Sequence, residues 1–177
     1  KGTQAEFLKE KYNLTHLSTG DIFRFNIKND TDLGKLAKTF MDKGDLVPDE
    51  VTIQMLQSEV DKNPNSAGFL FDGFPRTLAQ AEALDAFLKS KEQSITATVA
   101  LEADDNILVA RLLERGKTSG RPDDQDEEKI RNRYDEYNQK TAPLMNYYAE
   151  QGKFHAVNGI GTIAEVTQRL TAVFDNL

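Results

Sequence analysis

The most constraining feature of this chain is the octapeptide at residues 69–76, which reads Phe-Leu-Phe-Asp-Gly-Phe-Pro-Arg. A short apolar run bounded by turn residues is typical of a strand covered on both faces, and in parallel sheets the loops at the carboxyl ends of strands carry ligands. We therefore expect Asp72 at the mouth of a crevice, with Arg76 presenting a planar fork of donors matched to phosphate. Pro75 would fix the backbone between them. A plain polar turn is the alternative, because Asp, Gly and Pro are ordinary turn residues.

Strand and helix patterns alternate along the rest of the chain. Apolar periodicity predicts further strands at 14–17, 95–101 and 154–157, and helices at 2–12, 19–28, 33–43, 48–61, 78–88, 105–115, 127–140 and 163–173. Thr19 or Asp21 can cap the second helix, Thr77 can cap the fifth, and the seventh resumes after Pro143. Strands separated by helices indicate a single α/β domain over residues 1–177, with a parallel sheet covered by helices on both faces.

Composition narrows the functional classes. The chain has 177 residues, of which 38% are hydrophobic and 29% charged, so one domain with a real core is expected. No stretch approaches a membrane span, and a net charge of −7 argues against a broad nucleic-acid surface. The absence of cysteine excludes disulfides and thiolate zinc sites, and it fits a cytoplasmic protein. We therefore expect a protein that binds small anions, not nucleic acid or a membrane.

The hexapeptide Asp-Gly-Phe-Pro-Arg-Thr, followed by Gln80, resembles the nucleoside-monophosphate-binding signature of adenylate kinases. Other segments then also resemble that family. They are Lys1-Gly2-Thr3-Gln4 (end of the phosphate-binding loop), Ser18-Thr19-Gly20-Asp21 with Arg24, Gly44-Asp45-Leu46-Val47-Pro48-Asp49, Arg111, Arg115, Gly120-Arg121-Pro122-Asp123-Asp124, Arg133 and Thr141-Ala142-Pro143-Leu144. The resemblance covers nearly the whole chain. It implies a P-loop NTPase-type fold with a helical AMP-binding insertion at 18–47 and a short lid at 116–124.

The resemblance implies reversible, Mg²⁺-dependent phosphoryl transfer from ATP to AMP, giving two ADP, by a monomer that holds no zinc. The residues implied for catalysis are Lys1, Arg76, Arg115, Arg121 and Arg133. Those implied for ATP binding are Lys1, Gly2, Thr3, Arg111, Arg115 and Gly161. Those implied for AMP binding are Thr19, Gly20, Arg24, Leu46, Val47, Gly73, Arg76, Gln80, Arg121 and Arg133.

Individual roles follow from the same resemblance. Asp72 would hold Mg²⁺ through water, since Mg²⁺ keeps much of its hydration shell. Gln80 would read the adenine edge, because an amide offers a donor and an acceptor side by side. Arg111 would lie against the ATP base, and Asp123 or Asp124 would orient an arginine of the lid.

Simpler interpretations stay open for several of these residues. Lys1 could be a solvated terminus, and Arg24 and Arg76 could form surface ion pairs of little consequence. Gln80 could be a polar residue on the solvent face of a helix. The segment 158–161 could be only a loop. The two histidines, His16 and His155, have no partner in motif spacing, so we expect them to be structural.

Two further expectations concern the residues before Lys1 and the closing of the site over its ligands. A phosphate-binding loop needs glycines ahead of its lysine, so that successive backbone N–H groups can surround phosphate. We expect about a dozen residues upstream of Lys1, the length of a strand plus a turn. The insertion and the lid should close over the nucleotides to exclude water, with Gly44, Gly116 and Gly120 as candidate pivots.

Two alternatives to an adenylate kinase remain, a kinase of UMP or CMP and a nucleotide-binding module without catalysis. Pyrimidine kinases share Asp-Gly-Phe-Pro-Arg but typically follow it with an asparagine and an acidic residue, where this chain has Thr77 and Gln80. We predict that AMP is phosphorylated in preference to CMP and UMP, as measured by ADP formation with each acceptor. A clear preference for a pyrimidine would favour the first alternative. AMP binding without turnover would favour the second.

Overall fold

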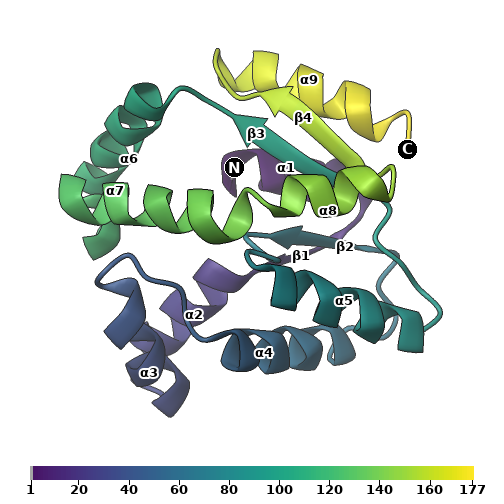
Figure 1. Ribbon diagram of the computed structural model, residues 1–177, viewed down its shortest axis with the longest axis horizontal. Coiled ribbons are helices and arrows are strands. Elements are labelled where there is room, and N and C mark those ends of the chain that lie inside the picture. The colour runs from purple at the N-terminus through teal and green to yellow at the C-terminus, as the bar shows by residue number, and fades with distance from the viewer. Residues whose placement is uncertain (1) are drawn as a thin grey trace.

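The computed structural model describes residues 2–177, so Lys1 lies outside the described residues. Helices and strands alternate along the chain, as the periodicity predicts (Figure 1). The strands are β1 Thr15–Ser18, β2 Phe69–Asp72, β3 Thr98–Glu102 and β4 Phe154–Asn158. The helices are α1 Gly2–Tyr12, α2 Thr19–Lys28, α3 Asp32–Met41, α4 Asp49–Asp61, α5 Leu78–Ser90, α6 Asp105–Ser119, α7 Glu127–Glu136, α8 Leu144–Glu150 and α9 Ile163–Phe174. A 3₁₀ turn, η1, spans Pro122–Asp124, and a π-helical turn, η2, spans Tyr137–Thr141.

All the strand pairing in residues 2–177 is parallel, which confirms a mixed α/β fold with parallel strands. The strands form two separate pairs, however, and not one continuous sheet. β1 pairs with β2 so that Ser18 lies opposite Asp72, and β3 pairs with β4 so that Thr98 lies opposite Phe154. β3 begins three residues later than predicted, because its pairing with β4 starts at Thr98; Ile95 packs against buried residues of α5 and α8.

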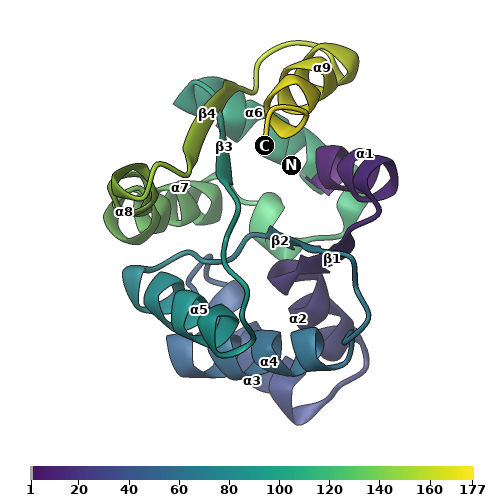
Figure 2. The same cartoon turned by 90° about the vertical axis from the view of Figure 1, so that its right-hand side faces the viewer.

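Side-chain packing joins the two strand pairs. Phe69 and Phe71 of β2 pack with α4 and α5, whereas Leu70, between them in sequence, packs with α1 and α9. This alternation is the two-residue period of a strand covered on both faces. Val99 of β3 joins the same cluster as Leu70, so apolar contacts connect the pairs. Figure 2 shows α1 and α9 on one side of the strands and α5 and α8 on the other.

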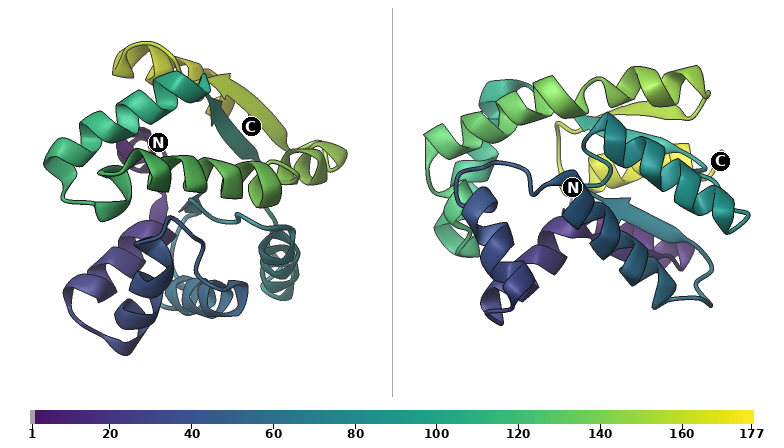
Figure 3. Two further views of the ribbon diagram at one scale, coloured as in Figure 1. Left: turned by 60° about the vertical axis from the view of Figure 1, so that its left-hand side comes forward. Right: turned by 60° about the horizontal axis from the view of Figure 1, so that its bottom comes forward.

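The helices α2 and α3 form a hairpin that shares a small core with α4, in which Phe23, Ala37, Val47 and Met55 are buried together. Figure 3 shows this hairpin at the same end of the molecule as α6 and α7. The N-cap of α2 is Ser18, whose Oγ accepts a hydrogen bond from the Asp21 backbone N–H at 3.3 Å. Neither Thr19 nor Asp21 caps this helix, because both residues lie inside its first turn.

The segment predicted as a short lid, 116–124, is more regular than expected. Helix α6 continues through Ser119 and ends at Gly120, whose φ of +67° suits glycine at a helix C-terminus. The 3₁₀ turn η1 follows directly.

Thr77 caps α5 as predicted, by accepting from the Gln80 backbone N–H at 3.2 Å. Within residues 2–177, no helix combines the length and the apolar character that crossing a membrane requires.

A substitution at Leu56 tests the packing of the core directly. This leucine of α4 is 1% exposed and packs against α5 and the strands β1 and β2. We predict that Leu56→Ala lowers the free energy of unfolding by about 2–5 kcal/mol, through lost burial and the cavity left behind. The matched control is Leu36→Ala, at a leucine that is 42% exposed. Urea denaturation of both variants measures the difference. Equal losses at the two positions would contradict this description of the core.

Candidate active site

The carboxyl ends of β1 and β2 bring two of the predicted binding segments together. The residues that follow these paired strands are Thr19 and Gly73, and the Thr19 hydroxyl donates to the Gly73 carbonyl at 3.2 Å. Arg76 donates from Nε to the same carbonyl at 2.7 Å. Thr141, which precedes α8, donates from Oγ1 to the Arg76 carbonyl at 2.6 Å. The Arg76 side chain is therefore fixed at the end of the strands by its own loop.

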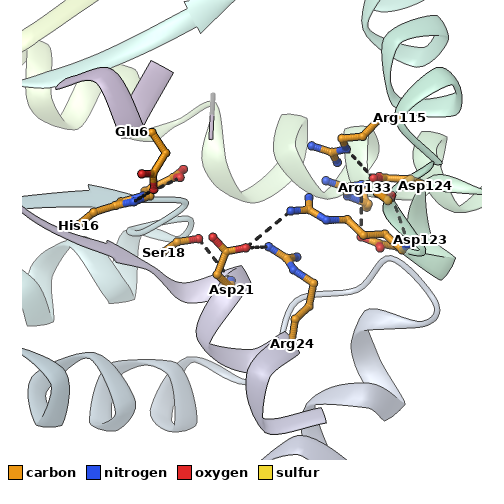
Figure 4. A network of polar contacts seen from close by, with 12 residues as sticks. Glu6, His16, Ser18, Asp21, Arg24, Arg115, Asp123, Asp124 and Arg133 are labelled. Carbon is orange, nitrogen blue, oxygen red and sulfur yellow. Dashed lines mark hydrogen bonds and ion pairs between the residues drawn. The ribbon is translucent and has the colours of Figure 1, made fainter. Parts of the chain in front are cut away.

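Asp21 links the α2 segment to the residues after α6. Its Oδ1 pairs with Arg24 one helical turn away, and Arg121 NH2 lies 3.6 Å from the same oxygen (Figure 4). Burial raises the pKa of Asp21, but the hydrogen bond and charge of Arg24 lower it more, so the net pKa lies below its usual value. One carboxylate thus serves two arginines from distant parts of the sequence.

A second carboxylate, Asp124, is fully buried and also serves two arginines. It accepts from Arg115 Nε and from Arg133 NH1, both at 2.6 Å, and Asp123 lies 3.3 Å from Arg133 NH1 (Figure 4). Burial alone would raise the pKa of Asp124, but the two guanidinium groups reverse the shift and lower it. Asp123 or Asp124 was predicted to orient an arginine of the lid; the arginines they contact here, Arg115 and Arg133, flank the segment 116–124 and do not belong to it.

Gly116 makes the Asp124 contact possible. A Cβ on Gly116 would lie 2.2 Å from the Asp124 carbonyl oxygen, so only glycine lets the 3₁₀ turn approach α6 this closely. Among the predicted pivots, Gly116 is therefore a packing residue inside a helix. Its position explains why Arg115, one residue earlier, can reach the buried carboxylate.

The four arginines that contact Asp21 and Asp124 lie in one region together with Arg76, where their charges act on one another. We refer to them as the arginine cluster, which consists of Arg24, Arg76, Arg115, Arg121 and Arg133. Burial lowers the pKa of Arg76 to about 10, with further lowering by the charges of Arg133 and Arg24 and opposing effects of Asp72 and Asp123. Burial, then Arg24 and Arg115, likewise lower the pKa of Arg121.

One donor in the arginine cluster has no protein acceptor. Arg115 NH2 is buried and finds no hydrogen-bond partner among the described residues. A buried, unpaired guanidinium nitrogen is costly unless something accepts its protons. The crowding of like charges and this open donor both favour binding of an anion at the cluster, and phosphate oxygens suit guanidinium forks.

Asp72 lies where its strand ends, as predicted, and its side chain is 8% exposed. His16 Nε2 lies 3.1 Å from its Oδ2, and His16 Nδ1 lies 3.5 Å from Glu6. The sequence showed no partner for His16 in motif spacing, and a structural role was predicted for it. The pairing could have been inferred only from the β1–β2 register, in which His16 comes two residues before the position opposite Asp72.

Gln80 is not on a solvent face, since it is only 2% exposed. Its Oε1 accepts from the Arg76 backbone N–H at 2.7 Å, and its Nε2 donates to Asp49 Oδ1 at 2.9 Å. Asp49 was missed as a functional candidate because an acidic residue in the first turn of a helix is ordinary. Asp49 lies two residues after Val47, which together with Leu46 is predicted to bind adenosine.

Several residues predicted on the ATP side lie outside the arginine cluster. Arg111 NH1 donates to the Gly159 carbonyl at 2.9 Å, which ties α6 to the loop after β4, where Gly161 lies. Gly2 and Thr3 form the exposed start of α1.

Comparison with known proteins agrees with this geometry. The adenylate kinase family model matches residues 1–153. The whole chain is 82% identical to an adenylate kinase of Flavobacterium psychrophilum, of which it covers 93%. Over the same shares it is 75% identical to the adenylate kinase of Flavobacterium johnsoniae and 46% identical to one of Bacteroides fragilis. The chain belongs to the adenylate kinase family.

Family membership implies the P-loop NTPase fold. In this adenylate kinase, hydrogen bonds hold the loop that follows the α2–α3 hairpin against α7. Asn132 Nδ2 donates to the Lys43 carbonyl at 2.7 Å and to Asp45 Oδ1 at 2.9 Å. Asn132 precedes Arg133 of the cluster, so the position of the hairpin is linked to that arginine. The sequence offered no signal for this contact, because asparagine on a helix is normally a solvent-facing residue.

Asp124 yields a prediction about stability and pH in the adenylate kinase. Because its pKa is lowered in the folded state, its carboxylate contributes stability in full above the ordinary value of 3.8, and this contribution disappears as pH falls through the lowered value. Asp124→Asn should lower the free energy of unfolding by about 1–3 kcal/mol at pH 7. Urea titrations at pH 7 and at lower pH values measure the difference.

The control is Glu128→Gln, which removes one exposed carboxylate from the start of α7. It should leave stability at pH 7 nearly unchanged. An Asp124→Asn deficit that persists undiminished at the acid end would contradict the role given to the carboxylate charge.

Proposed function

We propose that the arginine cluster is the phosphoryl-transfer centre of this ATP:AMP phosphotransferase, where the γ-phosphoryl group of ATP passes to the phosphate of AMP. The observation that carries the proposal is the convergence of like charges from α2, α6, α7 and the loops after β2 and α6. Such crowding is unfavourable, and a bound anion would offset the part of the charge that Asp21, Asp123 and Asp124 do not neutralise. Phosphoryl transfer requires this arrangement, because charge develops on the transferring oxygens while little covalent chemistry falls to the protein.

On the acceptor side, Arg24 and Arg76 would bind the phosphate of AMP. Asp21 already pairs with Arg24 and lies near Arg121, so this carboxylate occupies the place of an anion. The arriving phosphate would displace Asp21 and take over its hydrogen bonds. Thr19, Gly20, Gly73, Leu46 and Val47 would line the adenosine site, with Gln80 reading the base.

On the donor side, Arg115, Arg121 and Arg133 would surround the transferring group. The open donor on Arg115 NH2 provides a place for a phosphoryl oxygen. Asp124 holds Arg115 and Arg133 before substrate arrives, so no reorganisation energy is needed at the moment of reaction. Lys1, Gly2 and Thr3 would contact the phosphates of ATP, and Arg111 and Gly161 would lie near its base.

Mg²⁺ bound with the nucleotide would supply positive charge that offsets the charge of the phosphate oxygens. Within residues 2–177, no three His, Cys, Asp or Glu side chains form a cluster that could hold a metal ion. A single carboxylate, Asp72, at the strand end fits Mg²⁺, which is usually held by one or two carboxylates together with substrate phosphates and water. The same residues do not fit zinc, which needs several nitrogen or sulfur ligands.

The proposal treats residues 1–177 as one domain in which 18–47 forms the AMP-binding insertion and 116–124 the lid. A monomer suffices, because every arginine of the cluster comes from one chain. The hydrogen bonds from Asn132 to Lys43 and Asp45 support an insertion that closes against α7. We assign the protein to the cytoplasm on the absence of cysteine and on its nucleotide substrates.

Steady-state kinetics of arginine variants test the assignment. Arg24→Ala should raise KM for AMP by about tenfold or more, because a charged hydrogen bond to the phosphate is lost, and should change KM for ATP little. Arg115→Lys should instead lower kcat by about 100-fold, since the compact ammonium lacks the planar fork with which a guanidinium holds Asp124 on one side and donates to phosphate on another. ADP formation measured while each substrate is varied separates the two effects.

Arg131→Ala is the control, since Arg131 is exposed and pairs only with Glu127 on its own helix among the described ion pairs. It should leave all three parameters near their original values. If Arg131→Ala and Arg115→Lys have the same small effect, the cluster is not the transfer centre.

A further inference from the structure

We propose that Asp49 is a specificity-determining residue that selects a 6-amino purine over a 6-oxo purine, by fixing the direction of the Gln80 side-chain amide. The proposal rests on the function proposed above, in which Gln80 contacts the base of AMP. Asp49 itself would not touch the base. It would act through the amide that it holds.

The contacts around Gln80 define the direction of its amide. Nε2 donates to Asp49 Oδ1 at 2.9 Å, and Oε1 accepts from the Arg76 backbone N–H at 2.7 Å. The side chain is 2% exposed, so water cannot readily replace either partner. Both ends of the amide are therefore held by groups of the protein.

These partners allow only one orientation. An ionised carboxylate can accept but not donate, and a backbone N–H can donate but not accept. Rotating the amide by 180° would place Oε1 against the Asp49 carboxylate and Nε2 against the Arg76 N–H, which are both repulsive contacts. Thr77 donates from its hydroxyl to the same Asp49 oxygen at 3.0 Å, and this second donor further fixes the position of the carboxylate.

A fixed amide distinguishes purines by the groups at positions 1 and 6. Nε2 retains a second hydrogen and Oε1 a second lone pair after the contacts above. Adenine presents an acceptor at N1 beside a donor at N6, which complements these groups. Hypoxanthine and guanine present a donor at N1 beside an acceptor at O6, so donor would meet donor and acceptor would meet acceptor. A freely rotating amide would accommodate both kinds of base.

The location of the pair supports a role in recognition. Asp49 lies just after Leu46 and Val47, which are proposed to line the adenosine site. Arg76 belongs to the arginine cluster, and Gln80, four residues later, accepts from its backbone N–H. The base-reading amide is therefore attached to the same short segment that binds phosphate. In an enclosed site, a mismatched hydrogen bond is costly because water is not there to compensate.

The alternative is that Asp49 only ties the start of α4 to the start of α5, through Thr77 and Gln80. A purely structural tie would affect stability, and it would weaken the binding of every nucleotide by the same factor. The ratio of affinities for two bases separates the two roles, because it cancels any uniform loss.

The experiment is isothermal titration calorimetry of the purified protein with AMP and with IMP, whose base is hypoxanthine. We expect the unmodified protein to bind AMP about 100-fold more tightly than IMP. Asp49→Asn should reduce this ratio by about tenfold, because asparagine can donate as well as accept, so that only the Arg76 backbone N–H still favours one direction of the amide. Gln80→Leu should abolish most of the preference. The matched control Glu50→Gln removes an exposed carboxylate from the same helical turn and should leave the ratio unchanged.

Each outcome decides the proposal. An Asp49→Asn variant that binds both nucleotides more weakly with the same ratio would show a structural tie only and overturn it. Equal affinities of the unmodified protein for AMP and IMP would overturn it even if no variant folds. Failure of the underlying function is distinguishable, because the unmodified protein would then bind neither nucleotide.

Discussion

The buried carboxylate of Asp124 is the contact on which the rest of the site depends. It holds Arg115 and Arg133 with hydrogen bonds of 2.6 Å each, and it can do so because Gly116 lets the 3₁₀ turn pack closely on α6. Without this carboxylate, two guanidinium groups would repel each other in a partly buried region. The protein thus assembles positive charge for its substrates by placing a smaller number of carboxylates among the arginines.

On the acceptor side of the site a carboxylate also lies between two arginines, but there it is exposed to solvent. Asp21 pairs with Arg24 and lies near Arg121, in contrast to the sequestered Asp124. An exposed ion pair contributes little to stability, so a substrate phosphate could replace it at a small cost in free energy. A buried pair keeps its geometry. In the proposed mechanism the two aspartates therefore have different roles. Asp124 preserves the arrangement of the donors, and Asp21 would give up its partners to the arriving phosphate.

Much of the fold was predictable, because the spacing of apolar residues follows the strand or the helix period. Phe69, Leu70 and Phe71, for example, form the apolar run of a strand covered on both faces. The positions of Arg76 and Asp72 at a strand end were also predictable, since both lie in a specific motif. Contacts between distant segments were not. The pairing of Gln80 with Asp49, and of Asn132 with the chain around Gly44, depends on how helices pack, and neither leaves a periodic or motif signal. The division of the strands into two pairs was likewise not predicted, since periodicity does not specify strand neighbours.

The most direct measurement is a crystal structure of the protein with a bisubstrate analogue, in which two adenosines are joined by a chain of phosphates. The account predicts guanidinium nitrogens from every arginine of the cluster within about 3.5 Å of phosphate oxygens. It also predicts that Asp21 is released from Arg24 while Asp124 keeps Arg115 and Arg133. A phosphate chain bound away from the cluster, with Arg24 still paired to Asp21, would contradict the account.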